Sequence, residues 1–175
     1  MTNMFFNYVG EVTIRYKKNG KIFEMKKHNE GFAPLFRTIA ALLAGEQFPF
    51  GSISSIGLKK LVGGTGSNFV NLLKNDTIPI TQKPKSILLG NGKYACSVNT
   101  SISDSDMTSV TSDRNITVNS DKVFLYLMSS NGTALARVEL QNTTEHPCVV
   151  KDIEPGVQLF IQWNLSVDNP ESQST

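Results

Sequence analysis

The sequence predicts a mainly β protein: an antiparallel β-sandwich with an N-terminal hairpin and one amphipathic helix packed on it. Several segments alternate apolar and polar residues with the period of two that a half-buried strand requires. Turn-forming pairs, notably Asn19-Gly20 and Asn131-Gly132, separate such segments. One stretch, about residues 32–44, repeats its apolar residues with the period of a helix instead. Together these patterns favour two packed layers of strands.

The N-terminal hairpin is predicted for residues 8–27. From Val12 to Tyr16 apolar residues alternate with polar ones, so one face of the first strand is expected to be buried. Asn19-Gly20 accepts the positive φ angles of a type I′ turn, which returns the chain into a second strand through Ile22 and Phe23.

The helix is predicted for about residues 32–44. Pro34 suits its first turn, and the apolar residues from Leu35 to Leu43 recur at i, i+4, i+7 and i+8. This stripe is expected to pack on a sheet. Gly45 suits a left-handed helix end, and Asn29 is expected to cap or turn the chain where the hairpin stops.

The C-terminal third gives the clearest strand patterns. Residues 122–130 are apolar on both faces, which is typical of a central strand. Residues 133–141 and 157–167 alternate, so Trp163 is expected to point inward and Phe160 outward. These segments are expected to supply most of the core.

Other segments are less distinct. Residues 69–75 fit a short helix and a strand equally well, and residues 104–115 fit a loop or a weak strand. No repeat of fixed period is present. The sequence predicts a single β-sandwich domain over residues 1–167, followed by a flexible polar C-terminal tail at residues 168–175.

Charge is unevenly distributed along the chain. The net charge is +2, but residues 1–60 hold nine Lys or Arg and four Asp or Glu (+5), and the remainder holds eight and eleven (−3). This polarity suits head-to-tail packing of like subunits. No run of about 18 apolar residues occurs, so no membrane partner is expected.

A nucleic-acid partner is not expected either. The basic residues of the hairpin fall on opposite strand faces and form no coherent patch with the neighbouring aromatic residues. The basic residues are Arg15, Lys17, Lys18, Lys21, Lys26 and Lys27, and the aromatic ones are Tyr8, Tyr16 and Phe23.

Catalytic and metal-binding patterns do not emerge from the sequence. Neither His28 nor His146 has a His, Cys or carboxylate neighbour at the spacing of a metal site. Cys96 and Cys148 lie in apolar stretches typical of buried thiols, although a disulfide between them stays open. The glycine-rich residues 63–66 lack the Lys-Ser/Thr that completes a phosphate-binding loop. The sequence therefore predicts a non-enzymatic protein with no catalytic, cofactor-binding or metal-binding residues.

A series of motifs nevertheless carries a family resemblance. The hairpin ends in "HNEG", the helix reads "LFRTIAALLAG", and "IGL" and the loop "GGTGS" follow. Later "LMSSNGTALARVEL" leads through a Pro-Gly turn to "LFIQWNLSV". The chain resembles small virion structural proteins of tailed bacteriophages, of the neck, ring and tail-adaptor type found in crAss-like phages. The resemblance covers about residues 8–167 and is weakest over residues 94–119.

This resemblance implies a subunit of the virion, assembled in the cytoplasm of a bacterial host as a ring, neck or tail-adaptor component. Cyclic oligomers of the chain would contact the portal or other neck and tail proteins. The candidate assembly contacts are Met4, Phe5, Phe6, Phe48 and Phe50. Alternative interpretations are a carbohydrate- or receptor-binding β-sandwich of a phage fibre, a head decoration protein, and a small enzyme with a site assembled from scattered residues.

Overall fold

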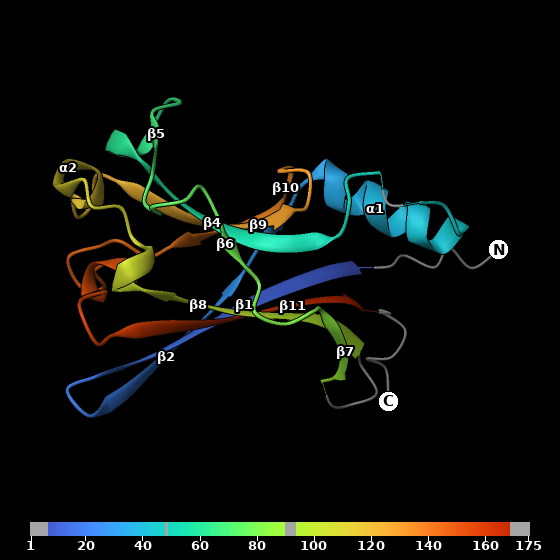
Figure 1. Ribbon diagram of the computed structural model, residues 1–175, viewed down its shortest axis with the longest axis horizontal. Helices are drawn as coiled ribbons and strands as arrows, with labels where there is room; N and C mark the ends of the chain where they lie inside the picture. The colour runs from blue at the N-terminus through green and yellow to red at the C-terminus, as the bar shows by residue number, and fades with distance from the viewer. Residues whose placement is uncertain (1–6, 48, 90–93, 169–175) are drawn as a thin grey trace.

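The alternating segments form two antiparallel β-sheets that face each other, as Figure 1 shows. The computed structural model describes residues 7–47, 49–89 and 94–168. The fold is mainly β, and the predicted β-sandwich is confirmed. The predicted C-terminal tail lies, from residue 169 on, outside the described residues.

The first sheet contains the N-terminal hairpin at one edge. Its strand order is β2-β1-β11-β8-β7, and every neighbouring pair is antiparallel. Asn19 and Gly20, both with positive φ, form the predicted two-residue turn between β1 and β2. The strands are β1 (Asn7–Lys18), β2 (Lys21–His28), β7 (Lys85–Leu88), β8 (Tyr94–Ser103) and β11 (Gln158–Asp168).

The second sheet has β9 at its centre, as the two-sided apolar pattern predicted. Its order is β3-β10-β9-β4-β5, with β6 also paired to β4. A bulge shifts the pairing between Ala134 and Ala136. The strands are β3 (Glu30–Gly31), β4 (Ile53–Leu61), β5 (Phe69–Asn71), β6 (Ile78–Pro79), β9 (Lys122–Ser129) and β10 (Ala134–Leu140).

The core lies between the sheets and takes residues from both. Trp163 on β11 is fully buried, opposite Val12 of β1 and Val98 of β8 in the same sheet. Its indole N–H donates to the side-chain oxygen of Asn29, 3.2 Å away. Asn29 lies in the short connection after β2, before the helix begins at Ala33, and its side chain bonds to the core.

The helix α1 (Ala33–Ala44) matches the predicted range within a residue. It lies beside β10 at one end of the molecule, where Leu35 enters the core at 4% exposure (Figure 1). Gly45 ends the helix with a φ of 70°, and the Glu46 N–H bonds the Ala41 carbonyl. The side chains of Leu42 and Leu43, part of the predicted stripe, are not among those described.

Short helical turns occupy several connections. Residues 104–115, predicted as a loop or weak strand, contain two of them, because Ser103 and Asp106 form a capping box and Arg114 bonds Asp104. Residues 69–71 settle as strand β5. The turns are η1 (Val62–Gly64), η2 (Asp104–Asp106), α2 (Thr111–Arg114) and η3 (Val149–Asp152).

Candidate functional surfaces

Of the five predicted assembly contacts, the structure describes Phe50 alone. Met4, Phe5, Phe6 and Phe48 lie outside the described residues. Phe50 is half-buried, and the guanidinium of Arg37 from α1 lies 5.7 Å from its ring centre. The Phe50 ring therefore contacts α1 and links the loop after α1 to the helix.

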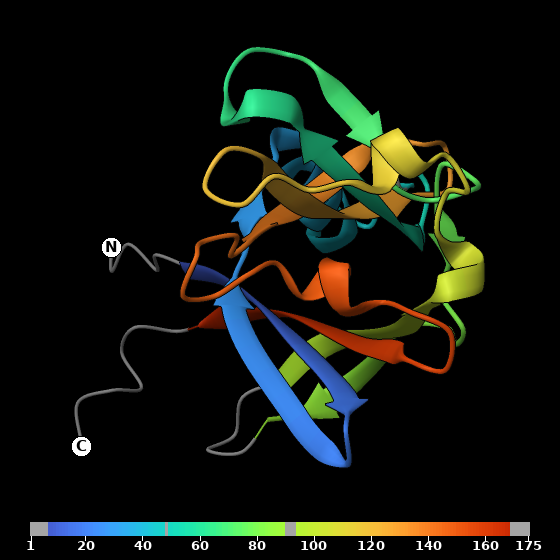
Figure 2. The same cartoon turned by 90° about the vertical axis from the view of Figure 1, so that its left-hand side faces the viewer.

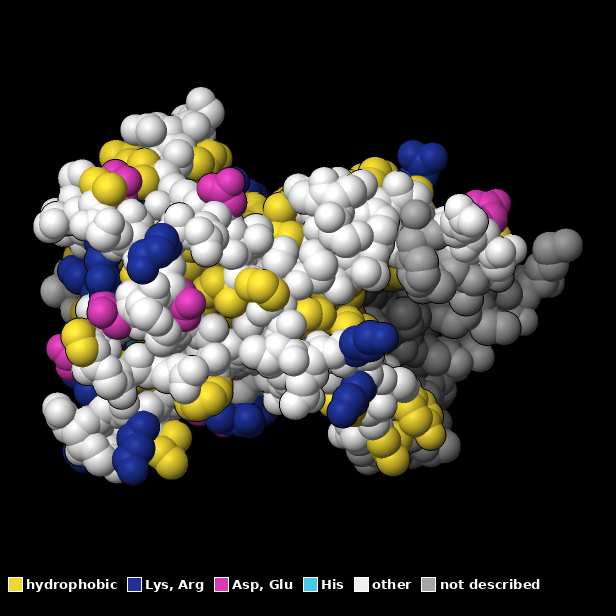
Figure 3. All heavy atoms as spheres, in the orientation of Figure 1, with side chains coloured by type: hydrophobic (Ala, Val, Ile, Leu, Met, Phe, Trp, Pro, Cys, Tyr) yellow, Lys and Arg dark blue, Asp and Glu magenta, His cyan; other side chains and the backbone are white. Residues whose placement is uncertain are grey.

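A cluster of exposed apolar side chains lies at the other edge of the first sheet. Leu88 is 60% exposed, Leu89 45% and Tyr94 65%, and Tyr94 lies directly across from Leu88 in the β7–β8 pairing. We call these three residues the β7 corner. Hydrophobic side chains gather over β7 in Figure 3. Exposed apolar side chains that cluster together are typical of contact surfaces.

A separate hollow lies near the start of β7, at the other end of the strand from Leu88. This hollow of about 630 Å³ is bounded by residues 52–53 and by residues 80–84, which lead directly into β7. Sequence reasoning missed this surface because it assigned no strand to residues 85–88. The available signal was the apolar run Ile87–Leu89 immediately before Gly90.

The opposite edge of the first sheet is strand β2. Among the described strands β2 pairs with β1 alone, and the hairpin crosses the lower part of the molecule in Figure 2. The Asn29 N–H bonds the Gly10 carbonyl, which fixes which residues of β2 bond to β1. Because this bonding alternates along a strand, odd-numbered residues of β2 bond to β1 and even-numbered ones direct their backbone groups outward. We call this outward row, Ile22, Glu24, Lys26 and His28, the β2 edge.

The outer face of the first sheet is polar around one aromatic ring. Phe160 is 55% exposed, and the strand pairing places it between Arg15 of β1 and Ser101 of β8. Gln158 donates to Ser101 on one side of the ring, and Gln162 follows on the other. A shallow pocket of about 210 Å³ adjoins the ring.

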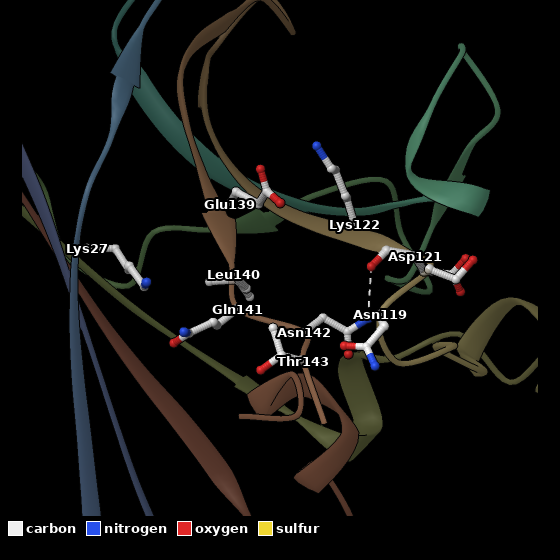
Figure 4. Close-up of a pocket in the computed structure, with 10 residues that line it drawn as sticks. Lys27, Asn119, Asp121, Lys122, Glu139, Leu140, Gln141, Asn142 and Thr143 are labelled. Atoms are coloured by element: carbon white, nitrogen blue, oxygen red, sulfur yellow. Dashed lines mark hydrogen bonds between the residues drawn. The ribbon is translucent and has the colours of Figure 1, made fainter. Parts of the chain in front are cut away.

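A second polar pocket, of about 330 Å³, lies between the two sheets at the β2 side. Lys27 reaches into it from β2, toward Leu140 at the end of β10 (Figure 4). Lys122 and Glu139 also line it. The residues that line the pocket thus include two lysines, Lys27 and Lys122, and two acidic residues, Glu139 and Asp121.

Asp121, a buried residue that lines this pocket, holds two loops together through hydrogen bonds. Asp121 accepts hydrogen bonds from the N–H groups of Thr117 (2.8 Å) and Gly63 (3.0 Å). Burial raises the pKa of Asp121, but these backbone bonds and Lys60 lower it by more, so its net pKa lies below the ordinary value. Asn142 donates to the Asp121 carbonyl at 2.8 Å, the contact drawn in Figure 4.

Neither histidine sits in a cluster of ligands. His28 is exposed at the end of β2, and His146 is exposed in a turn where its N–H bonds the Thr143 hydroxyl. Within the described ranges, no group of three or more His, Cys, Asp or Glu side chains is arranged to hold a metal ion.

Both cysteines are free thiols, which settles the question of a disulfide between them. Cys148 is fully buried, and burial raises its pKa to about 11. Cys96 is half-buried, and burial raises its pKa as well. Deprotonated thiols are the nucleophilic form, so burial keeps both groups in their unreactive state at neutral pH.

The basic residues of the hairpin are divided between its two faces. Arg15 bonds Glu24 on the outer face, and Lys18 bonds Asp152 on the inner face. Tyr16 and Phe23 stack on each other with ring centres 5.0 Å apart. Part of the charge and both of these aromatic rings are thus engaged within the chain.

No protein-family model matches the chain, and no curated protein or solved structure is significantly similar to it. In the part of the chain that the structure describes, no helix combines the length and apolar character that crossing a bilayer requires.

Proposed function

We propose that this chain is a non-enzymatic structural subunit of a tailed-phage virion, a ring, neck or tail-adaptor component that assembles as a cyclic oligomer. The observation that carries the proposal is the β7 corner, where Leu88, Leu89 and Tyr94 leave a large apolar area exposed at a sheet edge. Such an area is costly in water and favourable in an interface. The phage-protein resemblance of the sequence supplies the kind of particle.

A closed ring requires two different surfaces on each subunit. In this proposal the β7 corner of one subunit packs on a different surface of its neighbour. The portal or other neck and tail proteins then contact the ring. The contrast between the basic first 60 residues and the acidic remainder favours a head-to-tail arrangement.

The proposal is tested by quantitative mass spectrometry on purified particles. We expect this chain at a fixed ratio to the portal protein, and a ratio near one supports a ring or neck position. A ratio near that of the major capsid protein supports a head decoration protein instead. Absence of the chain from particles contradicts the proposal.

The β7 corner has its own test. A variant with Leu88→Ser and Tyr94→Ser removes most of the exposed apolar area without touching a buried side chain. We expect it to form no rings in sedimentation velocity under conditions where the unmodified chain does. Val62→Ser, at another exposed apolar position, is the matched control and is expected to assemble normally. Unchanged assembly of the double variant excludes the corner as the ring contact.

A saccharide-binding function is the second candidate, and Phe160 is the observation that favours it. Sugars stack on an exposed aromatic ring and bond to surrounding amides, and Phe160 lies between Gln158 and Gln162 beside a shallow pocket. A glycan array with the isolated protein tests this function. Binding that Phe160→Ala abolishes supports it, and an array without binding removes it.

A further inference from the structure

We infer that β2 is a self-pairing edge: two copies of the chain join by antiparallel pairing of their β2 strands, across a two-fold axis at Met25. The first sheets of the two copies then become one continuous sheet. The inference rests on one part of the proposed function, that the chain associates with copies of itself, and it names the surface and the register.

The first step is that β2 offers a long free edge. It spans Lys21–His28, and the β2 edge directs its N–H and C=O groups away from β1, its one partner among the described strands. Such a row of backbone groups accepts a further strand. The other edge of the same sheet is less suitable, because β7 has only four residues and directly follows Pro84.

The second step fixes the register. Since the outward backbone groups belong to even-numbered residues, an antiparallel partner places even residues opposite even residues. Centred on Met25, this pairing puts Glu24 of each copy opposite Lys26 of the other, and Ile22 opposite His28. Two opposite-charge pairs therefore form, related by the two-fold axis.

Displacing the strands by two residues in either direction loses this match. Centring on Glu24 places the two Glu24 carboxylates opposite each other and Lys21 opposite Lys27. Centring on Lys26 places the two Lys26 ammonium groups opposite each other. Like charges directly opposite across strands are destabilising, so the Met25 register is favoured over both neighbours.

The third step is that the inner face of the pairing is also compatible. The two Met25 side chains meet at the axis, where each is already half-buried against its own core. Phe23, 42% exposed, falls opposite Lys27 of the second copy, a cation over an aromatic ring. Lys27 lines the 330 Å³ pocket of Figure 4, so the incoming Phe23 lies next to that pocket.

The geometry of the contact separates it from the ring contact. A two-fold interface uses the same surface on both copies, so it closes a pair and cannot by itself build a ring. The β7 corner lies at the opposite edge of the sheet and remains accessible in the pair. The β2 pairing thus joins two subunits that each keep their ring surface.

Charge exchange tests the register. Sedimentation equilibrium of the full chain at low salt is expected to show dimers. Glu24→Lys and Lys26→Glu each place like charges opposite one another twice, and each is expected to weaken dimerisation by about tenfold or more. The double variant restores opposite charges and is expected to restore the dimer. A one-to-one mixture of the two single variants is expected to form a mixed dimer for the same reason.

Cysteine cross-linking gives a second readout of the register. Met25→Cys places two thiols at a close-spaced, non-hydrogen-bonded position, where Cα atoms lie about 4.5 Å apart, within disulfide range. We expect an oxidised covalent dimer from this variant, and none from Phe23→Cys or from the unmodified chain with its two native thiols. Circular dichroism confirms that each variant is folded.

Several outcomes overturn the inference. One is a chain that stays monomeric at about 1 mM. Another is a dimer insensitive to both single charge changes, and a third is the absence of a Met25→Cys cross-link in a dimer. None of these bears on whether the chain occurs in particles, which mass spectrometry decides separately. Conversely, absence from particles leaves a β2 dimer in solution unaffected.

Discussion

At the scale of single residues, Asn29 and Trp163 form the most consequential contact. Trp163 is the one tryptophan of the sequence and is fully buried, so its indole N–H needs a partner inside the protein. Asn29 supplies it from the short connection between β2 and β3. One side chain therefore ties the end of the hairpin to the centre of the core.

Asn29→Ala is expected to lower the free energy of unfolding by about 1–3 kcal/mol, because it leaves a buried N–H without its partner. Urea denaturation followed by circular dichroism measures the change. Asn68→Ala, at an exposed position, is the control and is expected to stay within about 0.5 kcal/mol of the original protein. Equal effects of the two substitutions would contradict this role.

Cys148 is expected to make the protein less stable at alkaline pH. The folded protein keeps the thiol proton up to about pH 11, whereas the unfolded chain releases it near pH 9. Between these values deprotonation stabilises only the unfolded state, so the free energy of unfolding falls as pH rises. Between about pH 8.5 and pH 10.5 the free energy of unfolding is expected to fall by about 1–2 kcal/mol more in the unmodified chain than in the Cys148→Ala variant. Parallel stability curves would show that Cys148 does not contribute.

At the scale of elements, the glycine-rich segment 62–66, which contains η1, depends on two different physical requirements. Gly64 and Gly66 both have positive φ, at 68° and 79°. A Cβ at Gly64 would lie 2.7 Å from the Ser120 carbonyl oxygen, whereas a Cβ at Gly66 would meet no atom within 4 Å. Only Gly64 is therefore required for space as well as for conformation.

Substituting alanine separates these requirements. Gly66→Ala is expected to cost about 1–2 kcal/mol, the penalty of a left-handed conformation with a side chain. Gly64→Ala is expected to cost clearly more, because the backbone must also move away from Ser120. Thermal denaturation of the two variants compares them directly. A smaller loss for Gly64→Ala than for Gly66→Ala would contradict the tight packing of η1 against residue 120.

The elements also show which features local sequence patterns predict and which they do not. The β1–β2 turn, the helix end at Gly45 and the inward side of Trp163 followed from the sequence, because each depends on local conformation or on period-two alternation. Residues 104–115 did not, since their helical turns depend on Arg114 bonding both Asp104 and the distant Ile153 carbonyl. Strand β7 was missed because four residues are too few to display a period.

At the scale of the whole molecule, one core joins the two sheets. The same buried cluster contains Val12 and Ile161 from the first sheet, Leu58 and Leu125 from the second, and Leu35 from α1. Neither sheet can expose its inner face without removing the partner surface of the other. The described parts of the chain are therefore expected to unfold together.

This cooperativity has a direct optical test. Trp163 fluorescence reports the core, and far-ultraviolet circular dichroism reports the strands. We expect the two signals to follow the same transition in guanidinium chloride, with a single midpoint. Separate midpoints would show that one sheet unfolds while the other persists.

Local sequence determined the longer strands, the helix and the sandwich class of this protein, because period-two alternation, turn pairs and the helical stripe act over neighbouring residues. Only the tertiary structure decided the strand order. The pairing of β1 with β11, which leaves β2 at the edge of the sheet, joins residues more than a hundred positions apart. The β7 corner and the β2 edge follow from that order. The strand order decides which edges and side chains stay unpaired at the surface, and local sequence patterns do not determine the strand order.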